Sequence, residues 1–117
     1  MEKETLKLIA DEHGLHSQCR QAVEEMAELT QAITKFWRYE GENPTVFKLC
    51  REHIIEELAD VEIMILQLKY LFKCEDAVEK IKAEKVEREL GRMIAHNDSI
   101  LRQKVTENIK DFKDEMR

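Results

Sequence analysis

The sequence predicts an all-α protein, an antiparallel bundle of four to five helices that oligomerisation completes. Two observations support this fold class. The 117 residues are 43 % hydrophobic and 38 % charged, with only three Gly and one Pro, which is typical of helical proteins. Apolar residues also recur at steps of three and four along most of the chain. A chain of this length buries roughly two-thirds of its unfolded surface, so we expect one domain over residues 1–117.

Four breaks divide the chain into its predicted helices. Residues 1–13 form a short helix that Gly14 ends, since glycine favours the position after a helix. The first long helix spans residues 15–39, and a loop with Asn43-Pro44 follows, where Thr45 is the predicted N-cap of the next helix. The apolar stripe of the first long helix consists of Leu15, Cys19, Ala22, Val23, Met26, Leu29, Ile33 and Phe36.

The second long helix, residues 46–72, is apolar nearly all round from Leu58 onward, which predicts the buried centre of a bundle. Residues 75–95 form a third long helix. Residues 96–99 interrupt the pattern, and the last helix spans residues 100–117 with a narrow stripe that packs on the bundle or on another subunit. The core positions expected in these two helices are Val86, Leu90, Met93, Ile94, Leu101, Val105, Ile109, Phe112 and Met116.

Two pairs of carboxylates are the main functional signal. Glu25 and Glu28 stand three residues apart in the first long helix, and Glu57 and Asp60 in the second, so each pair shares one helix face. The first pair lies at the edge of an apolar stripe. The second shares an arc with Met64, Leu68 and Leu71, where unpaired charges cost several kcal/mol, roughly, unless cations or protons compensate.

Antiparallel packing of the two long helices would bring the four carboxylates together. An oxygen-only set of ligands suits Mg²⁺ or Mn²⁺ better than zinc or copper. Since Mg²⁺ commonly takes its remaining ligands from substrate phosphates, the cluster predicts phosphate chemistry. Lys85, Arg88 and Arg92 line one side of the third long helix and are the candidates for holding phosphate oxygens.

Simpler interpretations stay open at each of these features. An isolated acidic pair is most often a solvated helix face, and Arg20, Lys35 or Arg51 would neutralise the acids structurally. The basic stripe would form surface salt bridges with neighbouring glutamates. A di-iron site needs Glu-x-x-His motifs, which this sequence lacks, so we expect His16 and His53 to be exposed or to cap helices. Trp37 is expected to pack in the core or against a subunit, with stacking on a nucleobase as the alternative.

Net charge, cysteine content and hydropathy limit the partners and the cellular compartment that we expect. A net charge of −6 disfavours non-specific binding to nucleic acids or membranes. Cys19, Cys50 and Cys74 show no Cys-x-x-Cys spacing, so reduced thiols are expected rather than disulfides or zinc. No run approaches the ~18 apolar residues that span a bilayer, and the N-terminus has no apolar signal core. We therefore expect a cytoplasmic protein.

At these residues the chain resembles the all-α nucleoside triphosphate pyrophosphohydrolases of the MazG-like superfamily. Their signature is Glu-Glu-x-x-Glu followed, after a variable gap, by Glu-x-x-Asp. Glu24-Glu25-x-x-Glu28 and Glu57-x-x-Asp60 match every acidic position. Gly14-x-x-x-Gln18 and Lys85-x-x-Arg88-x-x-x-Arg92 are similar to flanking features of the family. The resemblance covers residues 14–95 as the catalytic core and leaves out residues 1–13 and 100–117.

The resemblance implies Mg²⁺-dependent hydrolysis of (d)NTP to (d)NMP and pyrophosphate, in nucleotide-pool house-cleaning. In this interpretation Glu25, Glu28, Glu57 and Asp60 bind the metal and are catalytic, and Glu24 and Glu56 support them. Lys85, Arg88 and Arg92 bind the phosphates, while Gln18 and Trp37 are candidates for contact with the base. The resemblance also implies a homodimer or homotetramer. Specificity for dUTP or dCTP is an alternative, and a non-catalytic helical oligomerisation or adaptor module is the rival from another class.

Overall fold

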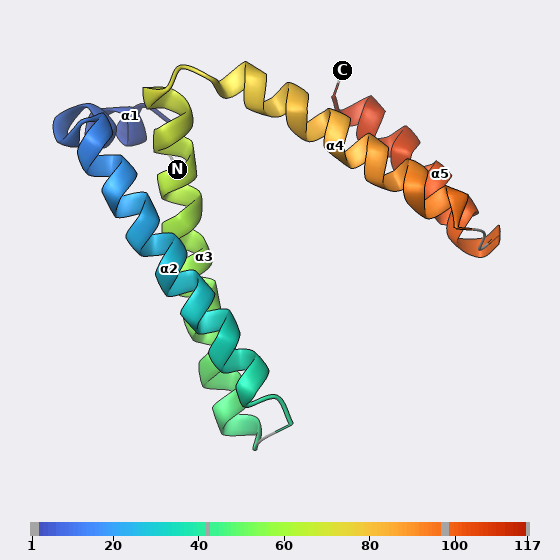
Figure 1. Ribbon diagram of the computed structural model, residues 1–117, viewed down its shortest axis with the longest axis horizontal. Coiled ribbons are helices and arrows are strands. Elements are labelled where there is room, and N and C mark those ends of the chain that lie inside the picture. The colour runs from blue at the N-terminus through green and yellow to red at the C-terminus, as the bar shows by residue number, and fades with distance from the viewer. Residues whose placement is uncertain (1–2, 42, 97–98, 117) are drawn as a thin grey trace. The chain divides into compact units, whose positions relative to one another are not determined.

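A computed structural model describes residues 3–41, 43–96 and 99–116, with only the backbone described for residues 99–101. This part of the chain consists of helices joined by short turns (Figure 1), which confirms the all-α prediction. The helices are α1 (Lys3–His13), α2 (Leu15–Arg38), α3 (Pro44–Leu71), α4 (Glu75–Ala95) and α5 (Ser99–Glu115). The chain separates into two compact units, Met1–Cys74 and Glu75–Arg117, and each is described by itself below.

The helix limits follow from residues with special backbone properties. Gly14 has φ +84°, a conformation that costs glycine little, and it both ends α1 and precedes α2. At the start of α3 the predicted cap was wrong. Asn43 is the N-cap, because its side-chain oxygen accepts a hydrogen bond from the Val46 N–H at 3.0 Å, and Pro44 occupies the first turn. Thr45 lies inside the helix instead.

The N-terminal unit is built on α2 and α3, which run antiparallel side by side (Figure 1). Two contacts mark the ends of this helix pair. Near the start of α2, the buried Gln18 donates a side-chain hydrogen bond to Gln67 of α3. Near its end, the rings of Phe36 and Phe47 lie 5.3 Å apart between centroids. These contacts fix the register and leave the acidic residues of both helices opposite one another, midway between them.

Helix α1 packs on this pair through Leu6 and Ala10, which are buried. The hydroxyl of Tyr70 in α3 donates to the carboxylate of Asp11, with oxygen–oxygen distances of 2.7 and 2.9 Å. The ammonium of Lys7 lies 5.5 Å from the centre of the Tyr70 ring. The start of the chain is thereby held against the end of α3.

The face by which α2 meets α3 differs from the predicted stripe. Ala22 and Ala32 are buried, whereas Val23, Met26 and Ile33 are 64 %, 45 % and 43 % exposed. Small residues at the contact let the two helix backbones approach closely. Periodicity alone does not show which side of the broad apolar stripe of α2, that of the alanines or that of the larger residues, faces α3. On α3 the apolar residues Leu58, Ile65 and Leu66 are also exposed, and so is Phe72 at its C-cap. The described core of this unit is therefore narrow and made largely of small side chains.

The C-terminal unit is a helical hairpin of α4 and α5. Among the side chains described in this unit Val105 is the buried one, while Leu90, Met93 and Ile94 of α4 are half-buried and Val86 is exposed. Lys113 of α5 forms an ion pair of 3.1 Å with Glu87 of α4. The predicted core position Leu101 lies outside the described side chains. A cavity of about 300 Å³ is lined by Ala83, Glu87, Leu90, Ile109, Phe112, Lys113 and Met116.

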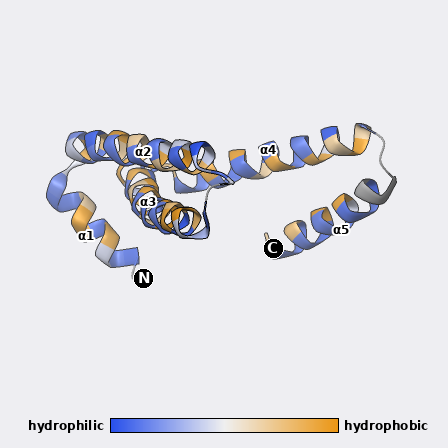
Figure 2. Cartoon of the chain, turned by 90° about the horizontal axis from the view of Figure 1, so that it is seen from below, coloured by the Kyte–Doolittle hydropathy of each residue, from blue (hydrophilic) through white to orange (hydrophobic). Residues whose placement is uncertain are grey.

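All five helices mix hydrophobic and hydrophilic residues along their length (Figure 2). In the described part of the chain, no helix combines the length and the apolar character needed to cross a membrane.

Candidate metal centre

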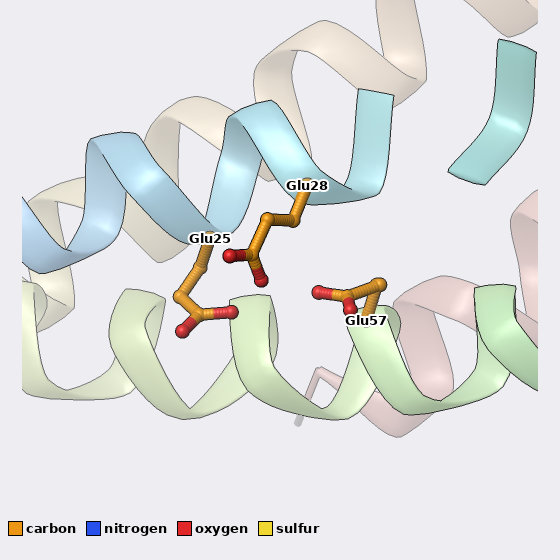
Figure 3. A group of neighbouring side chains, drawn as sticks. All are labelled: Glu25, Glu28 and Glu57. Atoms are coloured by element: carbon orange, nitrogen blue, oxygen red, sulfur yellow. The ribbon is translucent and has the colours of Figure 1, made fainter. Parts of the chain in front are cut away.

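Three carboxylates from two helices meet in the middle of the N-terminal unit. Glu25 and Glu28 project from α2 and Glu57 from α3 into the space between the helices (Figure 3). One oxygen of each lies within 4.8 Å of an oxygen of the other two. Glu57 is buried, Glu25 is half-buried and Glu28 is exposed. The group therefore extends from the interior of the helix pair to its surface.

Each of the two inner carboxylates has a polar neighbour one turn earlier on its own helix. Gln21, one turn before Glu25, donates its side-chain amide to Glu25 Oε1 at 2.8 Å. His53, one turn before Glu57, places its Nε2 3.4 Å from Glu57 Oε1. In both residues the second oxygen, Oε2, is buried and has no hydrogen-bond partner among the described atoms. Since an unsatisfied buried acceptor costs about 1–3 kcal/mol or more when charged, these two oxygens are suited to a cation.

The electrostatics of Glu25 reflect this crowding. Burial raises the pKa of the Glu25 carboxyl above its ordinary value, and the nearby charges of Asp60 and Glu28 raise it further. The hydrogen bond from Gln21 opposes the increase because it favours the charged form. Without a cation, the folded chain therefore favours the protonated form of Glu25 more than water does.

Asp60, the fourth predicted ligand, is exposed and lies outside the group of three. Its charge nevertheless acts on Glu25, as expected from the register of α2 and α3, which sets Asp60 opposite Glu25. Asp60 thus borders the group at the surface of the helix pair. That Asp60 is a metal ligand remains a prediction.

The donor set fits a hard divalent cation. In an octahedral Mg²⁺ site with bonds of roughly 2.0–2.1 Å, neighbouring oxygens lie about 3 Å apart and opposite ones about 4 Å. The three carboxylate oxygens, within 4.8 Å of one another, would draw closer around such an ion. Because Glu28 is exposed, the outer side of such an ion would remain open to water or to a substrate oxygen. Glu25, Glu28 and Glu57 are the residues that would hold the ion.

The remaining predicted residues are not members of this group. Glu24 and Glu56 are exposed on α2 and α3. Lys85, Arg88 and Arg92 are exposed on α4 in the C-terminal unit, and Arg92 pairs with Glu89 at 3.3 Å. Their phosphate-binding and supporting roles stay predictions.

The two candidates for contact with a base have different surroundings. Gln18 is buried and already engaged with Gln67. Trp37 is 74 % exposed near the end of α2, so the expectation that it packs in the core of its own unit was wrong. Packing against another subunit and stacking on a base both remain open for Trp37.

Sequence reasoning missed the two side chains that lie beside the inner carboxylates. His53 was expected to be exposed or to cap a helix, yet it is half-buried beside Glu57. Gln21 was not considered. The signal that would have found both is their position four residues before a glutamate, which places neighbours one above the other on a helix.

Comparisons of the chain with protein-family models, curated proteins and solved structures found no match.

Proposed function

We propose that this protein is a Mg²⁺-dependent nucleoside triphosphate pyrophosphohydrolase, which converts (d)NTP and water to (d)NMP and pyrophosphate. The supporting observation is the pair of buried, unpartnered oxygens of Glu25 and Glu57 in a group of three carboxylates. The reaction itself is inferred from the spacing of the acidic residues, which resembles that of the MazG-like superfamily. Mn²⁺ is the alternative ion.

When bound, a divalent cation neutralises phosphate charge and activates water for attack on phosphorus. The chain's own residues would prepare that chemistry. Gln21 and His53 lie against Oε1 of Glu25 and Glu57 and would leave the second oxygen of each carboxylate for the ion. Glu28 and Asp60 border the open side where a triphosphate would approach. Glu24 and Glu56 would support the ligands, and Lys85, Arg88 and Arg92 would hold phosphate oxygens.

We further propose a cytoplasmic homodimer or homotetramer that acts in nucleotide-pool house-cleaning, with the helical bundle completed between subunits. Neither nucleic acid nor membrane is expected to be a partner. Specificity for dUTP or dCTP is the narrower form of the same activity, in which Gln18 and Trp37 are the candidates for contact with the base. A non-catalytic adaptor module is the rival function, which the exposed apolar residues of α2 and α3 also suit.

The test is product analysis on a panel of the common dNTPs, dUTP and the NTPs with Mg²⁺. Chromatography should show equal amounts of monophosphate and pyrophosphate, and no diphosphate. Glu57→Gln and Asp60→Asn should each lower kcat/KM by at least about 100-fold. Glu62→Gln is the matched control, because Glu62 is exposed on α3 outside the acidic group.

Turnover of a single nucleotide would identify the narrower specificity. If no nucleotide is hydrolysed with either Mg²⁺ or Mn²⁺, the proposed enzymatic function is rejected. If Glu57→Gln then also leaves stability and metal binding unchanged, the adaptor function is supported.

A further inference from the structure

Each inner carboxylate of the acidic group follows, by four residues, a side chain that carries an N–H group. Gln21 precedes Glu25 on α2, and His53 precedes Glu57 on α3. Because four residues are about one helical turn, these side chains are neighbours on the helix surface. Gln21 donates a hydrogen bond of 2.8 Å to Glu25 Oε1, whereas His53 Nε2 lies 3.4 Å from Glu57 Oε1. Gln21 therefore makes the better-defined contact of the two.

The outer carboxylates follow acids at the same spacing. Glu24 precedes Glu28, and Glu56 precedes Asp60. All four of these residues are exposed. Water supplies the hydrogen bonds of an exposed carboxylate, whereas a buried one needs partners from the protein. A nitrogen donor thus stands one turn earlier where the carboxylate is withdrawn from water, and an acid stands there where it is not.

Gln21 occupies a position that helix packing alone would give to an apolar residue. It is half-buried and continues the row of Gln18 and Glu25, in steps of three and four, that faces α3. Three residues along each helix from the hydrogen bond between Gln18 and Gln67, Gln21 lies level with the buried Met64. A thioether is a weak acceptor for an amide. The described acceptor of the Gln21 side chain is Glu25, so the amide acts on the acidic group.

The hydrogen bond from Gln21 distinguishes the two oxygens of Glu25. Oε1 accepts the amide proton, while Oε2 is buried and has no hydrogen-bond partner among the described atoms. Carboxylates that bind metals are commonly oriented by such a neighbouring hydrogen bond. Burial raises the pKa of the Glu25 carboxyl, and the hydrogen bond from Gln21 is the influence that lowers it. The amide thereby also favours the charged form of the carboxylate, which is the form that binds a cation.

We propose that Gln21 is a positioning residue of the candidate metal centre, whose side-chain amide occupies Oε1 of Glu25 and presents Oε2 to a divalent cation. This role rests on the proposed function only in that the three carboxylates bind such an ion. It assigns part of the affinity of the centre to a side chain that binds neither the ion nor the nucleotide. Its effect is therefore measurable without any substrate.

The experiment is the affinity of the full chain for Mg²⁺ and for Mn²⁺ without nucleotide, measured by isothermal titration calorimetry. Gln21→Met keeps a side chain of similar length and removes the donor, so it should raise the dissociation constant of either ion at least about 10-fold. Gln31→Met is the matched control, because Gln31 is exposed on the same helix and Lys35, not an acid, follows it by four residues. It should leave both affinities unchanged.

Two further variants test whether the effect requires a donor and whether it passes through Glu25. Gln21→His, at about pH 8 where imidazole is neutral, restores an N–H group at the spacing that His53 has from Glu57. It should recover most of the lost affinity. In the Glu25→Gln background, Gln21→Met should change the affinity for Mn²⁺ less than about two-fold, because the carboxylate on which the amide acts is gone. A residue that only supported the fold would produce neither result.

Loss of the positioning role and loss of the enzymatic function would give different results. If wild type binds Mg²⁺ and Gln21→Met binds it equally well, or if Gln21→His binds it as weakly as Gln21→Met, the positioning role is overturned and the enzymatic function is unaffected. If wild type binds neither ion, both are overturned. If the affinities change as expected but no nucleotide is hydrolysed, the positioning role is supported and the enzymatic function alone is rejected.

Discussion

Gln18 and Gln67 join α2 to α3 by a buried side-chain hydrogen bond across 49 positions of sequence. Both residues are almost fully buried, at 5 % and 2 % exposure. Amides of this kind are costly when only one partner is removed, because the other then remains buried without its hydrogen bond. The pair therefore contributes specificity to the register that brings the acidic residues together.

Gln67→Ala is expected to lower the free energy of unfolding by about 1–3 kcal/mol, as measured by urea denaturation. The double change Gln18→Leu with Gln67→Leu should cost less than Gln67→Ala, since no polar group is left unpaired. Gln31→Ala, an exposed position on the same helix, is the control and should change stability little. A double variant as unstable as Gln67→Ala would contradict this explanation.

Glu57→Gln should stabilise the metal-free protein by roughly 1 kcal/mol, because it removes a buried charge whose Oε2 has no partner. The same change should abolish the stabilisation that Mg²⁺ gives wild type. Thermal unfolding with and without Mg²⁺ measures both effects in one series. Glu62→Gln should leave the Mg²⁺ effect intact. Equal Mg²⁺ stabilisation of wild type and Glu57→Gln would exclude Glu57 as a ligand.

The raised pKa of Glu25 predicts how stability depends on pH. The folded state holds this proton more tightly than the unfolded state, whose carboxyl titrates near the ordinary value of 4.5. The contribution of this carboxyl to the free energy of unfolding is therefore greatest below pH 4.5, the ordinary pKa. It is lost as pH rises through the pKa of the folded state. Urea denaturation of wild type and Glu25→Gln between acidic and neutral pH should show the variant gaining on wild type as pH rises. A constant difference would show that the Glu25 carboxyl titrates alike in both states.

Asn43→Ala should destabilise the protein by about 1 kcal/mol, because it removes the side chain that accepts the hydrogen bond of the Val46 N–H. Thr45→Ala should have a clearly smaller effect, since Thr45 lies beyond the cap. Chemical denaturation of the two variants separates the observed cap from the one that the sequence suggested. Equal losses would assign both residues to the start of α3.

The sequence was sufficient for the helices but not for the direction in which they pack. Breaks at Gly14 and at Asn43-Pro44 have local causes, so the helix limits were predicted within a few residues. The orientation of α2 was not, because it carries apolar residues on two adjoining sides. Its contact with α3 uses Ala22 and Ala32, while the side with Val23 and Met26 is left exposed. Which side of α2 packs on α3 depends on how closely the two backbones can approach, and the sequence of one helix alone does not determine this.

The acidic group could be predicted only in part, because its geometry also depends on how the two helices are oriented. Spacing within each helix placed Glu25 with Glu28 and Glu57 with Asp60, and short-loop packing brought the pairs together. Which carboxylates go inside depends on the rotation of each helix about its own axis. That rotation buries Glu57 and leaves Asp60 exposed, although both were expected in the same apolar arc.

The close contact at Ala22 and Ala32 also affects how this protein tolerates mutation. Neither residue carries a functional group, yet both are nearly inaccessible, at 2 % and 1 % exposure. A larger side chain at either position would push α2 away from α3 and widen the separation of Glu25 and Glu28 from Glu57. Affinity for a cation falls when its ligands are displaced by even an ångström or so. The two alanine methyl groups thus limit how far the carboxylates of α2 lie from Glu57, and larger residues at these positions would weaken the proposed cation site without removing any of its ligands.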